Sequence, residues 1–246
     1  MAFEGKVIAI TGGAQGIGLS TAQLLAKKGA SISLADTNAT TLAEVEANFK
    51  SQGVPILTTV LDVRNRQQVE EWIESTVKKF GRLDGAANIA GIVGKQIYKA
   101  NVTEVDDDDW NLVMGINVTG VLHCLRAELK HISEGGSVVN VSSEKGSRGH
   151  AKAAAYSTSK HAVIGLSRCA ALEGAARQVR VNTVAPGGTL TPMMLNVVKD
   201  NMPPAPNPLQ RHGQPEEVAN AIVWLLGSES SFITGELHHV DGGLFC

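Results

Sequence analysis

The chain has 246 residues, of which 43% are hydrophobic, enough for one large α/β domain or two small ones. Lys and Arg number 22 and Asp and Glu 24, so the net charge of −2 gives no general reason to expect nucleic acid or an anionic membrane as a partner. The three cysteines, Cys124, Cys169 and Cys246, are not spaced as metal ligands, and they predict a reducing compartment without a disulfide framework.

The first residues run straight into a predicted strand, without the basic region and the apolar segment of a secretory signal. No run approaches about 18 consecutive apolar residues, so no transmembrane helix is expected. We therefore expect a cytoplasmic protein that has neither nucleic acid nor a membrane as its partner.

Short apolar runs rich in β-forming residues alternate with longer helical patterns along the whole chain. Strands are predicted at Val7–Thr11, Ser31–Ala35, Ile56–Leu61, Leu83–Asn88, Ser137–Ser142, Val179–Val184 and Leu237–Val240. Helices are predicted at about Gly16–Lys28, Thr40–Gln52, Arg66–Phe80, Asp107–His131, Ala154–Arg177 and Pro215–Leu226. This alternation predicts an α/β fold of the Rossmann type, a doubly wound parallel sheet with helices on both faces. No linker or change in composition marks a second domain, so residues 1–246 are expected to form one.

A glycine-rich segment, TGGAQGIG at residues 11–18, follows the first predicted strand. Glycines let the backbone turn tightly and approach a pyrophosphate, and the next helix offers free N–H groups and the positive end of its dipole. Because the segment lies between the first strand and the first helix, it predicts a dinucleotide site rather than a turn that serves only packing. The residues expected to bind the cofactor here are Gly12, Gln15, Gly16, Ile17 and Gly18.

Asp36 ends the second predicted strand, where a carboxylate can accept hydrogen bonds from an adenosine ribose and repel a 2′-phosphate. The neighbouring Gln15, Thr37 and Asn38 supply no cation for such a phosphate, so the predicted cofactor is NAD rather than NADP. The alternative is that Asp36 is only a turn or cap residue.

Tyr156 and Lys160 are four residues apart in a predicted helix and therefore share one helix face. A phenol has an ordinary pKa of about 10, and a nearby ammonium lowers that pKa by favouring the phenolate. The pair is a candidate general acid/base, whereas the alternative is a half-buried tyrosine beside a lysine that reaches solvent.

Residues 187–213 are the irregular part of the sequence and contain five prolines. A loop of this length in a compact domain is usually functional or mobile. Methionines make adaptable apolar surfaces, so Met193 and Met194 predict that this segment is a mobile lid over a partly apolar substrate.

The run Asp106-Asp107-Asp108-Asp109 precedes a predicted helix. Carboxylates at a helix N-terminus complement the helix dipole, and this interpretation is favoured over a metal site. The seven histidines show no metal-ligand spacing, so no metal is expected.

With these residues in view, the chain resembles the classical short-chain dehydrogenases/reductases over essentially all of its length. Residues 11–18 match the family pattern T-G-x-x-x-G-x-G, and Asn88-Ile89-Ala90-Gly91 resembles its N-N-A-G segment with Ile89 in place of the second Asn. Ser143 precedes Tyr156 by the family's usual interval. Extended-type relatives have a tighter glycine pattern, and bacterial enoyl reductases space Tyr and Lys more widely. The resemblance implies these further cofactor contacts: Asp62, Val63, Asn88, Ala90, Gly91, Tyr156, Lys160, Pro186, Gly187, Thr189 and Thr191.

The resemblance also implies four catalytic residues, namely Asn117, Ser143, Tyr156 and Lys160. Tyr156 would transfer the proton, Lys160 would lower its pKa and bind the nicotinamide ribose, and Ser143 would hydrogen-bond the substrate oxygen. Asn117 would connect the proton relay to solvent. Ser142 is a competing candidate, but its spacing is one residue off and its side chain is expected on the opposite side of the strand.

The substrate pocket is expected near the catalytic serine, the loop after Asn88 and the predicted lid. Glu144 and Lys145 follow Ser143 directly, although they can also pair with each other or with solvent. His150 lies between Ser143 and Tyr156 and could line the pocket, but the position of a surface-loop residue is favoured for it. The candidate pocket residues are Val93, Glu144, Lys145, His150, Met193 and Met194.

The resulting hypothesis is an NAD-dependent oxidoreductase that interconverts a secondary alcohol and a ketone on a small-to-medium, partly apolar molecule. The alternative is an NAD-binding protein of this fold without redox turnover, a sensor or a pericyclase-like relative. The resemblance further implies a homotetramer or homodimer that pairs through the helices at 107–131 and 154–177. Residues 85–92 and 221–226 are similar to fungal secondary-metabolite dehydrogenases such as the chanoclavine dehydrogenases.

Overall fold

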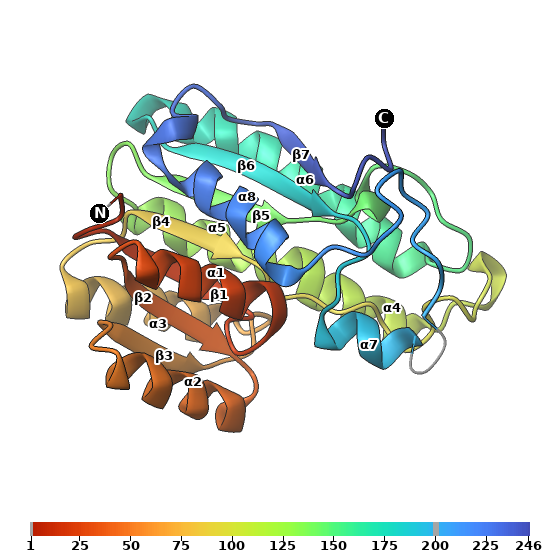
Figure 1. Cartoon of the computed structure of the whole chain (residues 1–246), viewed down its shortest axis with the longest axis horizontal. Helices are drawn as coiled ribbons and strands as arrows, with labels where there is room; N and C mark the ends of the chain where they lie inside the picture. The colour runs from red at the N-terminus through yellow and green to blue at the C-terminus, as the bar shows by residue number, and fades with distance from the viewer. Residues whose placement is uncertain (1, 199–201) are drawn as a thin grey trace.

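A seven-stranded parallel sheet forms the centre of the molecule in this computed structural model, which describes residues 2–198 and 202–246 (Figure 1). The strands are β1 Val7–Thr11, β2 Ser31–Asp36, β3 Ile56–Val60, β4 Gly85–Asn88, β5 Ser137–Val141, β6 Arg180–Pro186 and β7 Leu237–Val240. Their order is β3-β2-β1-β4-β5-β6-β7, so the chain winds outward from β1 to β3 and then returns to β4 on the other side. The predicted doubly wound sheet is confirmed, and its switch point lies between β1 and β4.

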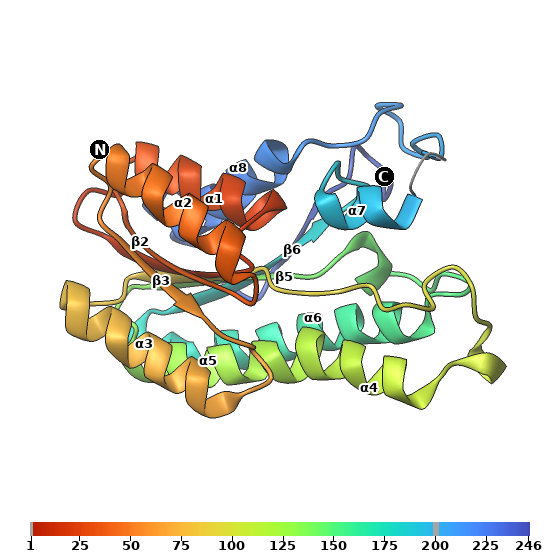
Figure 2. The ribbon, with the colours of Figure 1, turned by 90° about the horizontal axis from the view of Figure 1, so that it is seen from below.

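Helices cover both faces of the sheet (Figure 2). One face carries α1 Gly16–Lys27, α2 Ala39–Ser51 and α8 Pro215–Leu226, and the other carries α3 Arg66–Phe80, α4 Asp107–Met114, α5 Gly120–His131 and α6 Ala154–Gly174. A further helix, α7 Pro192–Val198, lies beyond the carboxyl ends of the strands. The layers therefore leave those ends accessible between α4 and α7.

The central strands are buried on both sides because each face of the sheet is covered. All five residues of β1 are buried. Ile8 and Ile10 belong to the apolar cluster that also contains residues of α1 and α8, whereas Ala9 between them belongs to the cluster around Trp72 of α3. Two cores thus hold the sheet in place, one on each face.

The structure differs from the sequence prediction in two helical regions. The helix expected to be continuous over 107–131 contains a π-helical turn, Gly115–Thr119, which carries the fully buried Asn117. The segment 187–213, expected to be a loop, contains α7; residues 199–201 of that segment lie outside the described residues. The first difference matters because π-turns inside helices often occur at functional sites.

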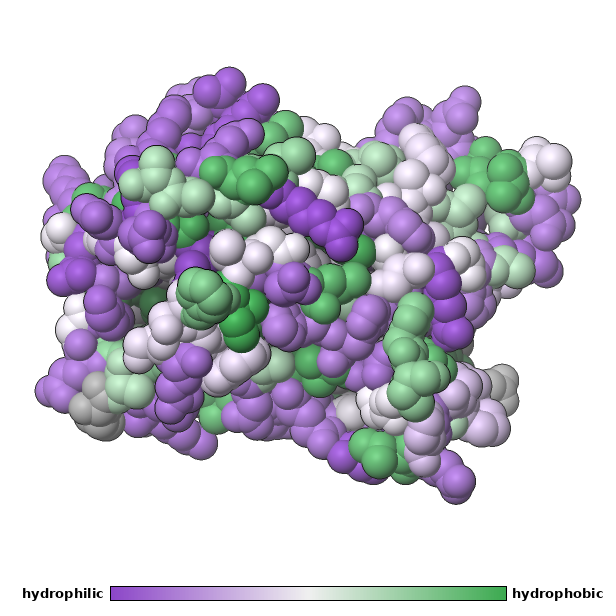
Figure 3. All heavy atoms as spheres, turned by 90° about the horizontal axis from the view of Figure 1, so that it is seen from above, coloured by the Kyte–Doolittle hydropathy of each residue, from purple (hydrophilic) through white to green (hydrophobic). Residues whose placement is uncertain are grey.

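Within the described residues, the stretch Asp107–His131 is long and apolar enough to cross a membrane by length and composition. Half of its most apolar window is buried inside the protein, and it carries the buried polar side chains of Asp109, Asn117 and Glu128, as a core helix does. It is therefore weak evidence against the expectation of no transmembrane helix. The surface seen from above shows apolar side chains in small patches among hydrophilic ones (Figure 3).

Candidate active site

A cleft of about 1020 Å³ lies at the carboxyl ends of the strands. It is lined by the turn after β1, by the ends of β2 to β6, and by residues of α6 and α7. Most of the predicted site residues line it together: Gly12, Gln15, Gly16, Ile17, Gly18, Asp36, Asp62, Val63, Ala90, Gly91, Val93, Ser143, Glu144, Lys145, His150, Tyr156, Lys160, Pro186, Gly187, Thr189, Thr191, Met193 and Met194. Two do not, Asn88 and Asn117, and both act from behind the cleft wall.

The turn between β1 and α1 has the shape that a pyrophosphate requires. Gly12 has φ +67°, and a Cβ there would lie 3.0 Å from the backbone of Ala90. A Cβ at Gly18 would lie 2.0 Å from the carbonyl oxygen of Gly12, so the turn closes only with glycine. The N-cap residue Gln15 makes no side-chain capping bond, and the first turn of α1 has no acidic residue. The N-terminal N–H groups of α1 are therefore available to phosphate oxygens, and a dinucleotide fits.

Asp36 both stabilises the local backbone turn and lines the cleft. Its Oδ2 accepts a hydrogen bond of 3.0 Å from the backbone of Ala14, and its Oδ1 accepts one of 3.0 Å from the backbone of Asn38. The residue also lines the cleft, and each carboxylate oxygen can accept a further bond. Asp36 thus fixes the turn and still presents its carboxylate to the cleft.

Asp62 is paired with a cation that the sequence interpretation did not consider. The guanidinium of Arg64 donates to Asp62 with an Nε–Oδ2 distance of 2.9 Å, and this contact lowers the pKa of the Asp62 carboxyl. Both residues line the cleft at the end that also contains Asp36. Because Arg64 is paired with Asp62, the two carboxylates of Asp36 and Asp62 leave this end of the cleft with a net negative charge.

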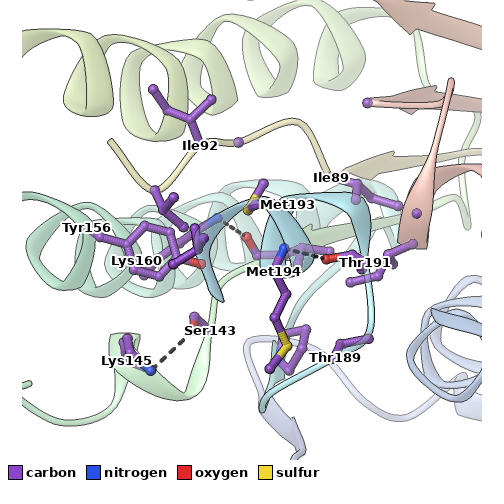
Figure 4. Close-up of a pocket in the computed structure, with 18 of the residues that line it drawn as sticks. Ile89, Ile92, Ser143, Lys145, Tyr156, Lys160, Thr189, Thr191, Met193 and Met194 are labelled. Carbon is purple, nitrogen blue, oxygen red and sulfur yellow. Dashed lines mark hydrogen bonds between the residues drawn. The ribbon is translucent and has the colours of Figure 1, made fainter. Parts of the chain in front are cut away.

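The two adjacent serines have different functions, as the strand geometry predicts. Ser142 is buried, and its hydroxyl donates a bond of 2.8 Å to the backbone oxygen of Lys160. Ser143 faces Tyr156, and a hydrogen bond between the two side chains favours the phenolate. Figure 4 shows Ser143 below Tyr156 and Lys160 in the pocket. Ser143 is therefore the serine placed next to the reacting groups.

The pKa of Tyr156 differs from the sequence prediction. It is raised to about 12, mainly by burial; the bond with Ser143 acts in the opposite direction, and Tyr98 and Glu144 add smaller upward contributions. The Nζ atom of Lys160 lies 5.7 Å from the Tyr156 ring centroid, and burial lowers the pKa of Lys160 to about 8. The expectation that Lys160 depresses the Tyr156 pKa is wrong for the protein by itself, because desolvation favours the neutral form of both side chains.

Lys160 and Asn117 flank a space that Gly91 leaves open. A Cβ at Gly91 would lie 3.1 Å from Asn117 Oδ1 and 3.3 Å from Lys160 Nζ. Lys160 Nζ is anchored by a bond of 2.9 Å to the carbonyl of Val141. Asn117 accepts from the backbone N–H of Ile92 and donates to its carbonyl, at 2.8 Å each. Asn117 therefore positions the loop after β4 from inside the π-turn.

Asn88 does not reach the cleft, contrary to its place among the predicted cofactor contacts. Its side chain donates to Glu128 at 3.0 Å and to Asn140 at 2.9 Å, and it is buried between β4, β5 and α5. Asn88 therefore connects two neighbouring strands to the helix that covers them. Glu128 is a buried carboxylate that sequence analysis missed, because its helix also carries exposed charged residues.

The substrate end of the cleft contains a charged group around Glu144. This buried carboxylate contacts the Nζ of Lys145, and it accepts a bond of 3.3 Å from Nε of Arg148, a residue that the sequence analysis did not select. Tyr98 and the exposed His150 also line the cleft, with ring centroids 5.5 Å apart. The prediction that Glu144 and Lys145 pair and the prediction that they line the pocket are thus both consistent with the structure.

Helix α7 supplies the apolar wall of the cleft. The Thr191 hydroxyl accepts a bond of 3.3 Å from the backbone of Met194, and Pro192 follows at the first helical position, a sequence pattern that typically starts a helix. Met193 and Met194 line the cleft from this helix (Figure 4). Met193 and Met194 thus lie where the predicted lid would place them, but the segment that carries them is a helix and not a loop.

The aspartates before α4 organise local structure. Asp106 caps the helix by accepting from the backbone of Asp109, whose own carboxylate accepts from the backbones of Lys95 and Gln96 at 2.8 and 3.0 Å. Within residues 2–198 and 202–246, no group of three or more His, Cys, Asp and Glu side chains could hold a metal ion.

The comparison with known proteins identifies the family. The family model described as enoyl-(acyl carrier protein) reductase matches residues 12–245. Short-chain dehydrogenase/reductase ABA4 of Pyricularia oryzae is 44% identical over 98% of this chain and 92% of its own. The chain belongs to the short-chain dehydrogenase/reductase family. It is accordingly an oxidoreductase of a family that interconverts alcohols and ketones.

Solved structures agree with this family and with the fold. The crystal structure of a levodione reductase has a TM-score of 0.91 at 35% identity, with 98% of this chain and 97% of that chain covered. The structure of an NAD⁺-bound xylitol dehydrogenase has a TM-score of 0.89 at 33% identity, with 99% and 100% covered.

Proposed function

We propose that this protein is an NAD(H)-dependent oxidoreductase that interconverts a secondary alcohol and a ketone on a small-to-medium, partly apolar molecule. The observation that carries the proposal is the convergence of Ser143, Tyr156 and Lys160 in one cleft with the phosphate-binding turn. Met193 and Met194 on α7 and Ile92 after β4 supply apolar surface for the body of the substrate.

The proposed proton transfer occurs at the phenol oxygen of Tyr156. Bound nicotinamide supplies hydride transfer and, when oxidised, a positive charge. Tyr156 takes the alcohol proton in oxidation and returns it to the carbonyl oxygen in reduction, while the Ser143 hydroxyl holds the same oxygen. Protonated Lys160 has three N–H donors, of which one is used by Val141, so two remain for ribose hydroxyls. Asn117 contributes indirectly through Ile92 and Ser159.

The preference for NAD over NADP is supported by Asp36 at the end of β2. Its carboxylate would repel a 2′-phosphate, and the nearby Arg64 is already paired with Asp62. The similarity to an NAD⁺-bound xylitol dehydrogenase supports the same choice. Oxidation is the favoured direction, since cells usually keep NAD mostly oxidised.

We further propose a homotetramer or homodimer in the cytoplasm. The outer face of α6 supports self-association: Leu172 is 81% exposed, and a Cβ at Gly165 would meet no atom within 4 Å. The fungal relative ABA4 supports the resemblance to fungal secondary-metabolite enzymes, so we place the reaction in secondary metabolism. No observation favours the alternative of a sensor or pericyclase-like protein, because Asn117, Ser143, Tyr156 and Lys160 are all present.

A panel of secondary alcohols with NAD⁺ or NADP⁺ tests the proposal. NADH formation with at least one alcohol, and a higher kcat/KM with NAD⁺ than with NADP⁺, are expected. Tight NAD⁺ binding without turnover of any alcohol or ketone would instead favour the sensor alternative.

A further inference from the structure

We propose that the substrate carries a carboxylate, which is bound by Lys145 and Arg148 while its alcohol or ketone carbon lies at Tyr156. This inference rests on the proposed oxidoreductase function and specifies its substrate class. Its basis is an uneven distribution of charge along the cleft, together with the geometry of the cluster formed by Glu144, Lys145 and Arg148.

The two ends of the cleft carry opposite net charge. Among the described residues, the carboxylates that line the cleft are Asp36, Asp62 and Glu144, and the first two lie at the adenosine end with only Arg64 between them. The substrate end has a single carboxylate, Glu144, together with Lys145, Arg148 and Lys160. An anionic substrate group is therefore attracted to the substrate end and repelled from the other.

Glu144 cannot satisfy both of its cationic neighbours. It contacts Lys145 Nζ through one oxygen and Arg148 Nε through the other, so one negative charge faces two positive charges. The terminal nitrogens of Arg148 have no hydrogen-bond partner among the described residues, and its side chain is 44% exposed. A guanidinium with free terminal N–H groups is the donor that binds carboxylates most specifically.

The cluster lies next to the reacting groups. Lys145 follows Ser143 by two residues in the 3₁₀ turn Glu144–Gly146, and its backbone N–H donates to the Ser143 hydroxyl at 3.2 Å, as Figure 4 shows. The Nζ of Lys145 lies 5.8 Å from the ring centroid of Tyr98, whose backbone N–H is fixed at 2.7 Å to the carbonyl of Lys152. The cation thus lies beside the aromatic ring of Tyr98, and the backbone of the same residue contacts the catalytic serine.

A cationic or neutral substrate fits this arrangement less well. Glu144 would have to leave two cations to bind an ammonium group, and both cations would remain close to that ammonium. A neutral substrate would leave the excess positive charge of a partly buried cluster without a counter-charge. A carboxylate supplies the missing negative charge and accepts from both side chains.

Equilibrium binding tests this inference without turnover. The protein loaded with NADH is titrated calorimetrically with cyclohexanecarboxylate and with cyclohexanecarboxamide, which has nearly the same shape but no charge. We expect the carboxylate to bind about tenfold more tightly or better. Lys145→Met and Arg148→Gln should each lower this ratio several-fold, and Glu144→Gln should raise it, because it removes the competing anion.

Lys99→Met is the matched control, since Lys99 is exposed in the loop next to Tyr98 and does not line the cleft. Its carboxylate-to-carboxamide ratio should equal that of the unmodified protein. NADH binding shows whether each variant is folded, and a ratio taken within one variant cancels a general loss of active protein.

Three results would overturn the inference. The two ligands could bind equally well, or the carboxylate could show no measurable binding. The third result is a carboxylate-to-carboxamide affinity ratio that changes in the same direction in Glu144→Gln and in Lys145→Met. Failure of the proposed function is a separate result. It would appear as carboxylate-selective binding without NADH formation from 4-hydroxycyclohexanecarboxylate or from any neutral alcohol.

Discussion

The Nδ2 atom of Asn88 donates a hydrogen bond of 3.0 Å to Oε2 of Glu128, and both side chains are buried beneath the loop that forms the cleft wall after β4. Burial raises the pKa of Glu128 to about 7, with the Asn88 bond acting in the opposite direction. Within the described part of the chain, neither the second carboxyl oxygen of Glu128, Oε1, nor the amide oxygen of Asn88, Oδ1, has a hydrogen-bond partner. The carboxyl group is therefore neutral in slightly acidic solution and ionised only at a cost in stability.

Glu128→Gln should change the pH dependence of stability. The ordinary carboxyl pKa is 4.5 and that of native Glu128 is about 7, so the native state binds the extra proton between these values. The contribution of Glu128 to stability should thus be highest below pH 4.5 and fall as pH rises to about 7, by at most about 1.4 kcal/mol per pH unit. Glu128→Gln removes this decline, so it should gain on the unmodified protein between pH 5 and pH 8 in urea unfolding. Stability curves of the two proteins that stay parallel from pH 5 to pH 8 would contradict this.

Asp36→Asn should shift cofactor preference toward NADP⁺. The substitution removes the charge that repels a 2′-phosphate but keeps one oxygen acceptor for the backbone of Ala14 or Asn38. The ratio of kcat/KM for NAD⁺ to that for NADP⁺ is expected to fall about tenfold, which corresponds to about 1.4 kcal/mol. Asn38→Ala, which removes the cap of α2 without changing charge, is the control. An unchanged ratio in Asp36→Asn would refute the role given to this carboxylate.

Gly18→Ala should weaken NAD⁺ binding far more than Gly149→Ala. The new methyl group at position 18 would lie 2.0 Å from the Gly12 carbonyl, so the phosphate turn must move, whereas a methyl group at position 149 meets no atom within 4 Å. Fluorescence titration is expected to show a loss of about tenfold or more for Gly18→Ala and almost none for Gly149→Ala, whose stability should change by about 0.5 kcal/mol or less. Equal affinities in the two variants would mean that the turn does not hold the pyrophosphate.

Leu172→Glu should reduce oligomer size if the exposed face of α6 is an interface between copies. A charge would replace a side chain that is 81% exposed in the single chain and would be buried on association. Light scattering after size-exclusion chromatography measures the mass. Val102→Glu changes an equally exposed residue, 79%, in a different part of the surface and should leave the mass unaltered. Oligomers of the same size in both variants would exclude this face.

The fold and the central site were predictable because their signals are local. The strands of a covered parallel sheet are continuous apolar runs, and β5 and α6 follow one another in the chain, which brings Ser143, Tyr156 and Lys160 together. Helix α7 was missed because the prolines after it suggested a loop, although Thr191 followed by Pro192 is a helix-start pattern.

Other features depend on burial, which the sequence pattern did not show. Glu128 lies between residues such as Arg126 and Lys130 on its helix and looks like a surface residue until the packing of α5 on β4 is known. The pKa direction at Tyr156 was predicted from its charged neighbour, whereas desolvation dominates. Arg148 became a candidate only when the structure placed it against Glu144.

The rate of alcohol oxidation by Tyr156→Phe tests the central claim most directly. The chain has two tyrosines, and both line the cleft, so Tyr98→Phe is a control that removes the same hydroxyl group. With NAD⁺ and the best secondary alcohol of the panel, Tyr156→Phe should lower kcat by about 10²- to 10⁴-fold, while Tyr98→Phe changes it by less than about tenfold. A Tyr156→Phe variant that binds NAD⁺ and oxidises the alcohol at the rate of the unmodified protein would contradict the account.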